Sequence, residues 1–517
     1  MASRSTRSTR SPSHPRERTV LIRRGEPTPP IAFGAGPVEE RLDGPRVPVD
    51  DALRARLAAT GAEVVDTPAV LDEASRDWWP LAMIWALDAR VAARAAVVVR
   101  PHDRDEVAAV LRTCHEARVP VTAAAGRSGV CGASVPVFGG VLLDLTALAG
   151  IIAVDEESLL VEVAPGTFGD VFEDELRERH GLTCGHWPQS IALSTVGGWL
   201  ACRGAGQLST RYGKIEDIVE RLDVVLADGT LVHTGGHPRA AAGPDLTQLF
   251  VGSEGTLGII VGAVLRAHRI PAATTRSAWS FPTFAAALDT MRRIVQRGAT
   301  PAVLRAYDPI EAARSYEIDA AVLLVHDEAD AVIVDATRIV VEEEVDRGGA
   351  ERLDDGLVER WFSHRNDASA LEALISRGFV VDTMEVSAPW RAVPGVYDAV
   401  TEGLRSVEHT VAASAHQSHS YPDGACLYFT FAGRPPAEAR EAYYRAVWDA
   451  GQRAALRAGA ALSHHHGVGL NRSRFAAEAL GSGLGVLQSV KDALDPHGIL
   501  NPGKLGLTSP FGSPGWP

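Results

Sequence analysis

The chain has 517 residues, more than one hydrophobic core usually supports, so we expect at least two packed units. A hydrophobic content of 46%, a charged content of 22% and a mean hydropathy of +0.00 are typical of a globular protein. The net charge of −14 excludes a general nucleic-acid binder, because phosphate backbones require a basic surface.

The N-terminal residues 1–45 are rich in Pro, Arg and Ser, and we expect a disordered tail followed by a helical segment over 46–94. The tail lacks the apolar run of a signal peptide, and no stretch is apolar and long enough to span a membrane. Five widely spaced cysteines without a CxxC pair indicate neither a disulfide framework nor a zinc site, so a cytoplasmic location fits best. The basic residues are nearly all arginine, and we interpret the scarcity of lysine (only Lys214, Lys491 and Lys504) as coding bias.

Residues 95–271 predict a mixed domain of strands and helices. Short β-branched runs bounded by Gly and Pro alternate with helical periods, as in the strands 95–101, 139–145 and 159–166 and the helices 104–117 and 168–179. Asp228-Gly229 predicts a hairpin turn, and Pro271 marks the end of the domain.

From residue 272 the pattern changes to strands separated by long amphipathic helices, which favours an antiparallel sheet covered by helices on one face. This second domain is expected over 272–490. The segment 491–507 is expected to return to the first domain, and 508–517 to be a loose tail. The overall fold class is therefore α+β.

Three segments rich in small residues lie between the strands of the first domain. They are AAAGRSGVCGASVPVFGG (123–140), GHWPQSIALSTVGGWLACRGAG (185–206) and DLTQLFVGSEGTLGII (245–260). Such loops let backbone N–H groups approach a polyanion, and Gly197-Gly198 open a helix whose N-terminus favours negative charge. One such loop could be a tight crossover turn, but three in one unit indicate a common ligand.

These segments resemble the FAD-binding domain of the vanillyl-alcohol oxidase/PCMH superfamily, in its FAD-linked oxidase branch. WPQSIALSTVGGW and GSEGTLGII are the most specific pieces, LDPHGILNPGKL resembles the C-terminal signature of the branch, and the similarity spans about residues 90–505. The resemblance implies a two-lobed PCMH-type FAD-binding domain, a cap domain and non-covalently bound FAD.

In the family the first loop wraps the FAD pyrophosphate, the second lies along the flavin and ribityl chain, and the third contacts the adenine side. The residues that match are Gly126, Arg127, Ser128, Gly129, Pro188, Ser190, Ser194, Thr195, Gly197, Gly198, Arg203, Gly204, Glu254, Gly255, Thr256 and Ile260. Ala125 and Arg127 stand where the family commonly has glycine. Arg127 either pairs with the pyrophosphate, in which case Arg127→Ala weakens FAD retention, or points to solvent.

Two motifs of the second domain are candidates for chemistry: HQSHSYPDGACLYFTF (416–431) and SHHHGVG (463–469). A surface polyhistidine patch and a structural metal cluster are alternatives for the histidine run. We predict no metal, because consecutive residues of a regular helix or strand do not face one ion and no carboxylate cluster accompanies them. Gly467 and Gly469 indicate close approach to a ligand, and imidazoles suit proton exchange near neutral pH.

Together these two motifs resemble the alkyldihydroxyacetonephosphate synthases (alkylglycerone-phosphate synthases). The resemblance implies catalytic roles for Tyr421, His464, His465 and His466, and a reaction that exchanges the acyl chain of acyl-dihydroxyacetone phosphate for a fatty alcohol through a flavin adduct. Tyr421 would exchange a proton at the substrate if neighbouring cationic imidazoles lower its pKa; otherwise it is a sheet residue with its hydroxyl in solvent. The metal pattern of the related 2-hydroxyacid dehydrogenases is altered here, with His465 at the position of its Glu and Cys426 near that of its Asn.

One departure concerns substrate binding. Leu371 stands where the synthases carry an active-site arginine; Arg365 or Arg377 could substitute, although their spacing does not support it. Arg305, whose alternative is a surface ion pair with Asp308, and His419 are the predicted substrate-binding residues.

The departure at Leu371 leaves an FAD-dependent oxidase or dehydrogenase of another small hydroxylated substrate as the alternative function. A flavin-binding protein without turnover is disfavoured by the Tyr and His motifs. The expected partner is a small molecule, with a lipid phosphate as one candidate, and the resemblance is compatible with a homodimer and with contact to a membrane surface.

Overall fold

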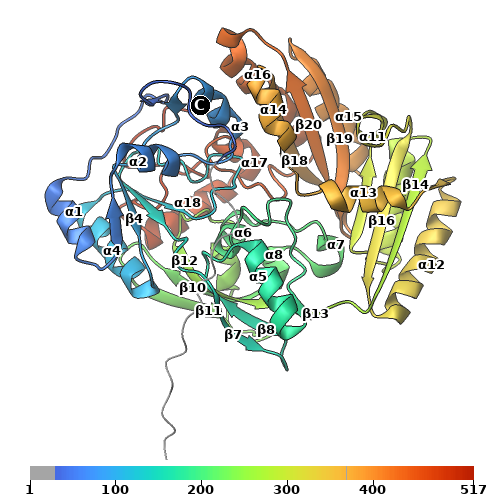
Figure 1. Ribbon diagram of the computed structural model, residues 1–517, viewed down its shortest axis with the longest axis horizontal. Helices are drawn as coiled ribbons and strands as arrows, with labels where there is room; N and C mark the ends of the chain where they lie inside the picture. The colour runs from blue at the N-terminus through green and yellow to red at the C-terminus, as the bar shows by residue number, and fades with distance from the viewer. Residues whose placement is uncertain (1–28, 368, 517) are drawn as a thin grey trace, which may run out of the picture.

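The computed structural model describes residues 29–367 and 369–516, and Figure 1 shows two domains that meet along a central boundary. The first lobe of the N-terminal domain is a four-stranded sheet of order β2-β4-β6-β5. Its strands are β2 (Glu63–Val65), β4 (Val97–Arg100), β6 (Val141–Asp144) and β5 (Val121–Ala124), and α1 (Asp51–Ala58) and α4 (Arg104–Ala117) pack beside it. Helix α4 begins where Asp103 accepts hydrogen bonds from two backbone N–H groups and ends at Arg118 in the left-handed conformation.

The second lobe is a five-stranded antiparallel sheet of order β11-β10-β12-β8-β7. Its strands are β7 (Ile151–Asp155), β8 (Leu160–Val163), β10 (Val219–Val225), β11 (Leu231–Gly235) and β12 (Ile259–Arg266). The Asp228-Gly229 pair forms the predicted hairpin between β10 and β11, with Gly229 at a φ of +84°. The helices α5 (Gly169–Glu175) and α6 (Val196–Cys202) complete the apolar core of this lobe.

The C-terminal domain contains a seven-stranded sheet in which every neighbouring pair is antiparallel, in the order β17-β14-β16-β15-β19-β20-β18. Its strands are β14 (Ala273–Phe281), β15 (Val303–Tyr307), β16 (Ala321–Ala329), β17 (Glu351–Leu353), β18 (Val380–Pro389), β19 (Thr410–Ser420) and β20 (Gly424–Gly433). The predicted fold class, a two-lobed PCMH-type domain with an antiparallel cap, is confirmed.

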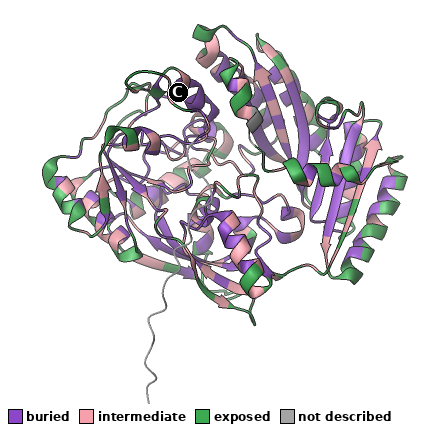
Figure 2. Ribbon diagram, viewed as in Figure 1, coloured by how far each residue is buried: buried purple, intermediate pink, exposed green. Residues whose placement is uncertain are grey.

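The two faces of this sheet have different neighbours. Leu323 and Val325 of β16 pack on the helices that cover one face, which are α10 (Phe284–Gln296), α12 (Ala331–Arg347), α15 (Val393–Arg405) and α16 (Arg440–Arg457). The alternate residues Val322 and Leu324 pack with Trp361 of α13 (Gly356–His364) and with Leu208 and Tyr212 of the N-terminal domain. Both faces are therefore buried, as the purple strands of Figure 2 show, and one of them is turned to the N-terminal domain.

The two predicted tails differ from the expectation wherever the structure describes them. Ile31 and Leu42 are buried, and β1 (Glu39–Glu40) pairs in parallel with β3 (Arg90–Val91), so 29–45 is packed rather than disordered. At the other end Trp516 is buried against Trp79, with ring centroids 5.2 Å apart. In both tails a few apolar side chains are buried against other segments, and composition alone does not predict this burial. The rest of the expected N-terminal tail, 1–28, lies outside the described residues.

The segment expected to return to the first domain lies beside β5. The backbone N–H of Val121 donates to Ile499, and Asn501 donates back to Val121, both at 2.8 Å. The expected helical segment 46–94 contains α1, α2 (Pro68–Ala74) and α3 (Pro80–Leu87) but also contributes the edge strand β2. Within 29–367 and 369–516, none of the helices is both apolar enough and long enough for a membrane crossing.

Candidate active site

The three glycine-containing loops of the N-terminal domain meet one another. A methyl group added at Gly126 of the first loop would lie 2.2 Å from the carbonyl oxygen of Leu193 in the second loop. A methyl group at Gly255 of the third loop would lie 3.5 Å from Cβ of Ala123 in the first loop. Gly126 is therefore needed where two stretches of backbone approach closely, and Gly255 is favoured by its φ of +73°. Because the loops contact one another, they form one site rather than three independent turns.

The first loop places Arg127 against the N-terminal helices. Arg127 has a φ of +53°, and its Nη1 donates to the carbonyl oxygen of Glu73. Burial lowers the pKa of Arg127, so the alternative of a side chain in solvent is wrong. Ser128 and Gly129 follow in the same turn, and Gly129 faces the carboxylate of Asp77.

The hydroxyl groups of the second loop are used within the loop itself. Ser194 accepts a hydrogen bond from the indole of Trp199 at 2.7 Å and donates to the carbonyl oxygen of Ser190 at 2.8 Å. Thr195 is the N-cap of α6 and accepts from the backbone N–H of Gly198 at 3.3 Å. The loop, which starts at Pro188 and includes Gly197, therefore offers a ligand mainly backbone groups.

Several predicted cofactor residues have side chains directed elsewhere. Arg203 donates to Gln248 and pairs with Glu216 at 3.3 Å, while Gly204 after it closes the end of α6. The hydroxyl of Thr256 donates to the carbonyl oxygen of Ser253, and Ile260 is buried in the apolar core of the second lobe. Local pairing and burial in the core explain why these side chains are not available at the meeting point of the loops.

Glu254 of the third loop binds the histidine segment of the other domain. Its Oε1 accepts from the backbone N–H of Val468 at 2.6 Å, and its Oε2 accepts from Gly469 at 2.9 Å. A methyl group at Gly467 would lie 2.4 Å from Oε1, so only glycine fits there. The carboxylate thus holds the histidine loop next to the site formed by the three loops.

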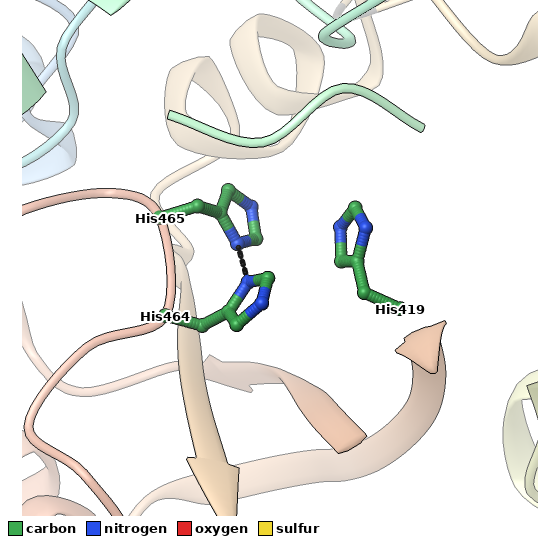
Figure 3. A group of neighbouring side chains, drawn as sticks. All are labelled: His419, His464 and His465. Atoms are coloured by element: carbon green, nitrogen blue, oxygen red, sulfur yellow. Dashed lines mark hydrogen bonds between the residues drawn. The ribbon is translucent and has the colours of Figure 1, made fainter. Parts of the chain in front are cut away.

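The predicted Tyr and His residues form a hydrogen-bonded chain. Tyr421 Oη lies 2.8 Å from Nε2 of His464, and Nδ1 of His464 lies 2.9 Å from Nδ1 of His465. The ring of His419 faces both imidazoles in Figure 3, and its Nδ1 lies 2.7 Å from the hydroxyl of Ser209. The alternatives of a surface polyhistidine patch and of a Tyr421 hydroxyl in solvent are therefore wrong.

A buried carboxylate organises the turn that carries the histidines. Oε1 of Glu385 accepts hydrogen bonds from the backbone N–H groups of His464, His465 and His466 and from the hydroxyl of Ser463. Its second oxygen pairs with Arg472, and both partners are fully buried. The imidazole of His466 is directed toward this pair, with Nδ1 3.8 Å from Glu385, and so differs from His464 and His465.

Burial decides the protonation of the site. Desolvation holds the pKa of His419, His464 and His465 well below the usual value of 6.5, and nearby cations such as Lys214 act in the same direction on His464. Desolvation also raises the pKa of Tyr421. The condition set for Tyr421, a pKa lowered by cationic imidazoles, is thus not met: the imidazoles are neutral and the phenol keeps its proton.

Arg305 lies on β15, beside the strand β19 that carries His416 and His419. Its Nη2 is 2.5 Å from Nε2 of His416, and its Nε donates to Tyr307. The expected alternative, a surface ion pair with Asp308, is wrong because Asp308 instead caps α11 (Pro309–Tyr316) and accepts from Glu311 N–H. Arg305 therefore keeps a charge without a direct carboxylate partner in the described part of the chain.

The loops also fit a ligand rich in hydrogen-bonding groups. Beside each of them lies a buried polar group that lacks a hydrogen-bond partner among the described residues: Oδ2 of Asp77 next to the first loop, both ring nitrogens of His186 in the second, and the hydroxyl of Ser253 in the third. Such groups are rare in folded proteins unless a ligand or water satisfies them.

Comparison with known proteins agrees with this geometry. Residues 95–235 match the model of an FAD binding domain, and 270–505 match the C-terminal domain of FAD linked oxidases. The chain is 31% identical over 431 residues to an uncharacterized FAD-linked oxidoreductase of Escherichia coli, YgcU, covering 79% of this chain and 88% of that protein.

The chain belongs to the FAD-linked oxidoreductase family. FAD is the cofactor of this family, and the residues of the three loops would hold it. That FAD is bound without a covalent link stays a prediction.

Other relatives of this chain include synthases. The alkyldihydroxyacetonephosphate synthase of Dictyostelium discoideum is 29% identical over 449 residues, covering 79% of this chain and 73% of that protein. A solved structure of an alkyldihydroxyacetonephosphate synthase superposes with a TM-score of 0.73 at 24% identity, covering 91% of this chain and 88% of that one. At this identity the superposition establishes the shared fold only.

The prediction of no metal assumed a regular helix or strand at the histidine run, and this assumption is wrong. His464 and His465 lie in an irregular loop, and ring nitrogens of these two residues and of His419 lie within 4.8 Å of one another. The three imidazoles are therefore close enough to share an ion, although no carboxylate belongs to the group.

Sequence reasoning missed the residues that position the site. The three lysines interpreted as coding bias are all buried and donate to backbone carbonyl oxygens: Lys214 to His464, Lys491 to Thr256 and Lys504 to Val135. The rarity of lysine in an arginine-rich chain was the available signal. Glu385, one of two carboxylates in the largely buried strand VVDTMEV, was another.

Proposed function

We propose that this protein exchanges the acyl chain of acyl-dihydroxyacetone phosphate for a fatty alcohol, with Tyr421, His464 and His465 at the reacting centre and His466 as the residue that positions them. The observation that supports this most directly is the hydrogen bond between Tyr421 and His464. FAD, when bound, would supply the electron-accepting ring on which the substrate carbon is held.

The contacts define how a proton can move along this chain. A neutral imidazole has one donor and one acceptor nitrogen. If Nδ1 of His465 carries a hydrogen and donates to Nδ1 of His464, then Nε2 of His464 carries the hydrogen of that ring and donates to the phenol oxygen of Tyr421, which leaves the phenol hydrogen free for the substrate. Transfer of a proton from Tyr421 to the substrate can therefore be followed by transfer back from the imidazoles.

Tyr421 acts in this scheme as a proton donor rather than as a base. Burial raises its pKa, so the phenol is protonated at neutral pH. Glu385 fixes the backbone of the histidine turn and so holds Nε2 of His464 at hydrogen-bond distance from the phenol. His466 acts through Glu385 and is a positioning residue.

The second candidate is oxidation of another small hydroxylated substrate. Leu371 favours it, because it packs against the apolar cluster of the C-terminal domain, where it offers no charge for a phosphate. The E. coli relative, named as an FAD-linked oxidoreductase, also favours it.

The test uses the purified, FAD-loaded protein with palmitoyl-dihydroxyacetone phosphate and hexadecanol in the absence of oxygen and dyes. We expect fatty acid release and ether formation, and we expect Tyr421→Phe to slow both by about 10²–10⁴-fold because a positioned proton donor is lost. Tyr443→Phe, which removes a hydroxyl bonded to Thr410 in the cap, is the matched control. Flavin reduction by a hydroxylated substrate, with turnover only after an external electron acceptor is added and without ether formation, would favour the oxidase instead.

A further inference from the structure

Arg365 lies between the two domains, directly after α13. Its guanidinium carbon is 5.3 Å from the ring centroid of Trp187, which precedes Pro188 in the second cofactor loop. Its carbonyl oxygen accepts a hydrogen bond from the side chain of Gln207 at 3.3 Å. Two residues after Gln207, Ser209 contacts His419, so Arg365 stands close in the fold to the histidine cluster.

Three buried polar atoms at this point have no hydrogen-bond partner among the described residues. They are Nη1 of Arg365, Nε1 of Trp187 and Oε1 of Gln207. Buried polar groups are nearly always satisfied, so a convergent set without partners indicates a missing ligand or water. Two of the three are N–H donors, which suits a ligand rich in acceptor oxygens.

The charge of Arg365 is also uncompensated. Within 29–367 and 369–516 it forms no ion pair, and burial lowers its pKa to about 10. The carboxylate that acts on it electrostatically, Glu328, already accepts from Tyr212 at 2.7 Å and from His326 at 3.1 Å. A second cation, Arg177, also acts on it, and this adds to the cost of a buried positive charge without an anion.

A second arginine lies on the same wall. The guanidinium carbons of Arg305 and Arg365 lie 5.8 Å and 5.6 Å from the ring centroid of Trp361. Arg305 contacts His416 of β19, the strand that also carries His419, whereas Arg365 lies at the boundary between the domains. The two arginines therefore extend from β19 to this boundary. Guanidinium groups bind phosphate through two parallel hydrogen bonds, and two of them suit a doubly negative group.

We propose that Arg365 and Arg305 bind the phosphate group of the substrate at the boundary between the domains, and that Arg365 replaces the arginine missing at Leu371. This inference deepens the proposed function and rests on it for the place of the reacting centre. Phosphate binding itself does not depend on which reaction follows.

The test is calorimetric titration of the full-length, FAD-loaded protein with inorganic phosphate at constant ionic strength, beside a titration with acetate. We expect phosphate to bind more tightly than acetate, and we expect Arg365→Leu to weaken phosphate binding by about tenfold or more, since a hydrogen bond to a charged group is lost. Arg377→Leu removes an exposed arginine 12 positions along the chain, after α14 (Ser369–Ser376), and should bind like the wild type. Arg365→Lys keeps the charge without the planar fork and should be intermediate.

Several results would overturn the proposal. One is the absence of phosphate binding by the wild type, as expected if water satisfies the unpartnered atoms. The others are a loss of phosphate affinity in Arg377→Leu equal to that in Arg365→Leu, and binding of acetate more tightly than phosphate by the wild type. If Arg365→Leu no longer retains FAD, Arg365→Lys is the test of phosphate binding. If Arg365 binds the phosphate, Arg365→Lys should have a higher KM for the phosphorylated substrate and an unchanged kcat. Phosphate binding that depends on Arg365 without acyl exchange would refute the proposed function alone, whereas acyl exchange without phosphate binding would refute this inference alone.

Discussion

Glu254 of the third cofactor loop accepts a hydrogen bond from the backbone N–H of Val468 at 2.6 Å, although 214 residues separate the two in the sequence. Through this contact the domain that carries the glycine loops holds the loop that carries the histidines. The position of the imidazoles relative to the cofactor loops therefore depends on this buried carboxylate together with Lys214, which donates to the carbonyl oxygen of His464.

Replacing Glu254 with Gln should loosen the histidine loop. The neutral amide accepts less strongly from Val468 and Gly469, and its NH2 group faces donors, so we expect a loss of about 1–3 kcal/mol in stability. The thermal midpoint and the turnover should both fall while FAD content is largely kept. Glu157→Gln, at an exposed turn, is the control; a wild-type midpoint and rate in Glu254→Gln would contradict the linking role.

The buried pair of Glu385 and Arg472 should be sensitive to the loss of either partner. Glu385→Gln leaves the fully buried Arg472 without its counter-ion, which costs about 3–5 kcal/mol in such pairs. We expect a clear drop in the urea midpoint. The double variant Glu385→Leu/Arg472→Met should recover only part of it, because the N–H groups of the histidine turn still lack an acceptor.

The exposed pair of Arg276 and Glu359 provides the comparison for this experiment. Glu359→Gln should change the free energy of unfolding by less than about 1 kcal/mol, because water screens the charges. Equal effects at the two pairs would show that burial is not what makes Glu385 important.

Stability should decrease at acidic pH because of buried histidines. Burial lowers the pKa of His186 to about 3, whereas the unfolded chain has the usual value near 6.5. Between these values the unfolded state binds more protons, so the stabilising contribution is complete above pH 6.5 and is lost as pH falls toward 3.

His186→Phe tests this dependence, because the imidazole lies against Trp199 and has no hydrogen-bond partner in the described structure. We expect the variant to lose less stability on acidification, by up to about 1.4 kcal/mol per pH unit for one proton. Unfolding midpoints between pH 7 and pH 4, with FAD content measured in parallel, are the readout. Parallel curves for variant and wild type would contradict the assignment.

Removal of metal should leave activity unchanged, as the sequence-based prediction of no metal requires. His419, His464 and His465 are close enough to bind an ion, but the group lacks a carboxylate, and Lys214 places a positive charge beside it. Dialysis against EDTA should change neither turnover nor the flavin spectrum. Stoichiometric zinc, together with activity lost on chelation and restored by zinc, would show that the imidazoles form a metal centre.

Arg127→Ala should weaken FAD retention. The guanidinium lies in the first loop and is held by the carbonyl oxygen of Glu73, so it is not free to turn into solvent. We expect about a tenfold loss of FAD affinity or more if it contacts the pyrophosphate. The ratio of flavin to protein after dialysis is the measurement, with the exposed Arg112→Ala as control, and an unchanged ratio would refute the contact.

The sequence by itself determined the parts of this protein that depend on local chemistry. Short Gly- and Ser-rich loops between strands, the Asp228-Gly229 turn and the strand–helix rhythm after residue 272 each record a local backbone requirement, and they led to the FAD-binding fold. The pairing of Tyr421 with the histidine run also followed from motifs, because each motif is contiguous in the chain.

Only the tertiary structure decided the charges and the contacts between distant segments. Glu385 meets Arg472 across 87 residues, the three lysines are buried, and Tyr421 keeps its proton beside neutral imidazoles. Trp516, in a segment expected to be loose, packs on Trp79. These outcomes depend on desolvation, which is fixed by the segments that come together in the folded chain and therefore cannot be obtained from any one stretch of sequence.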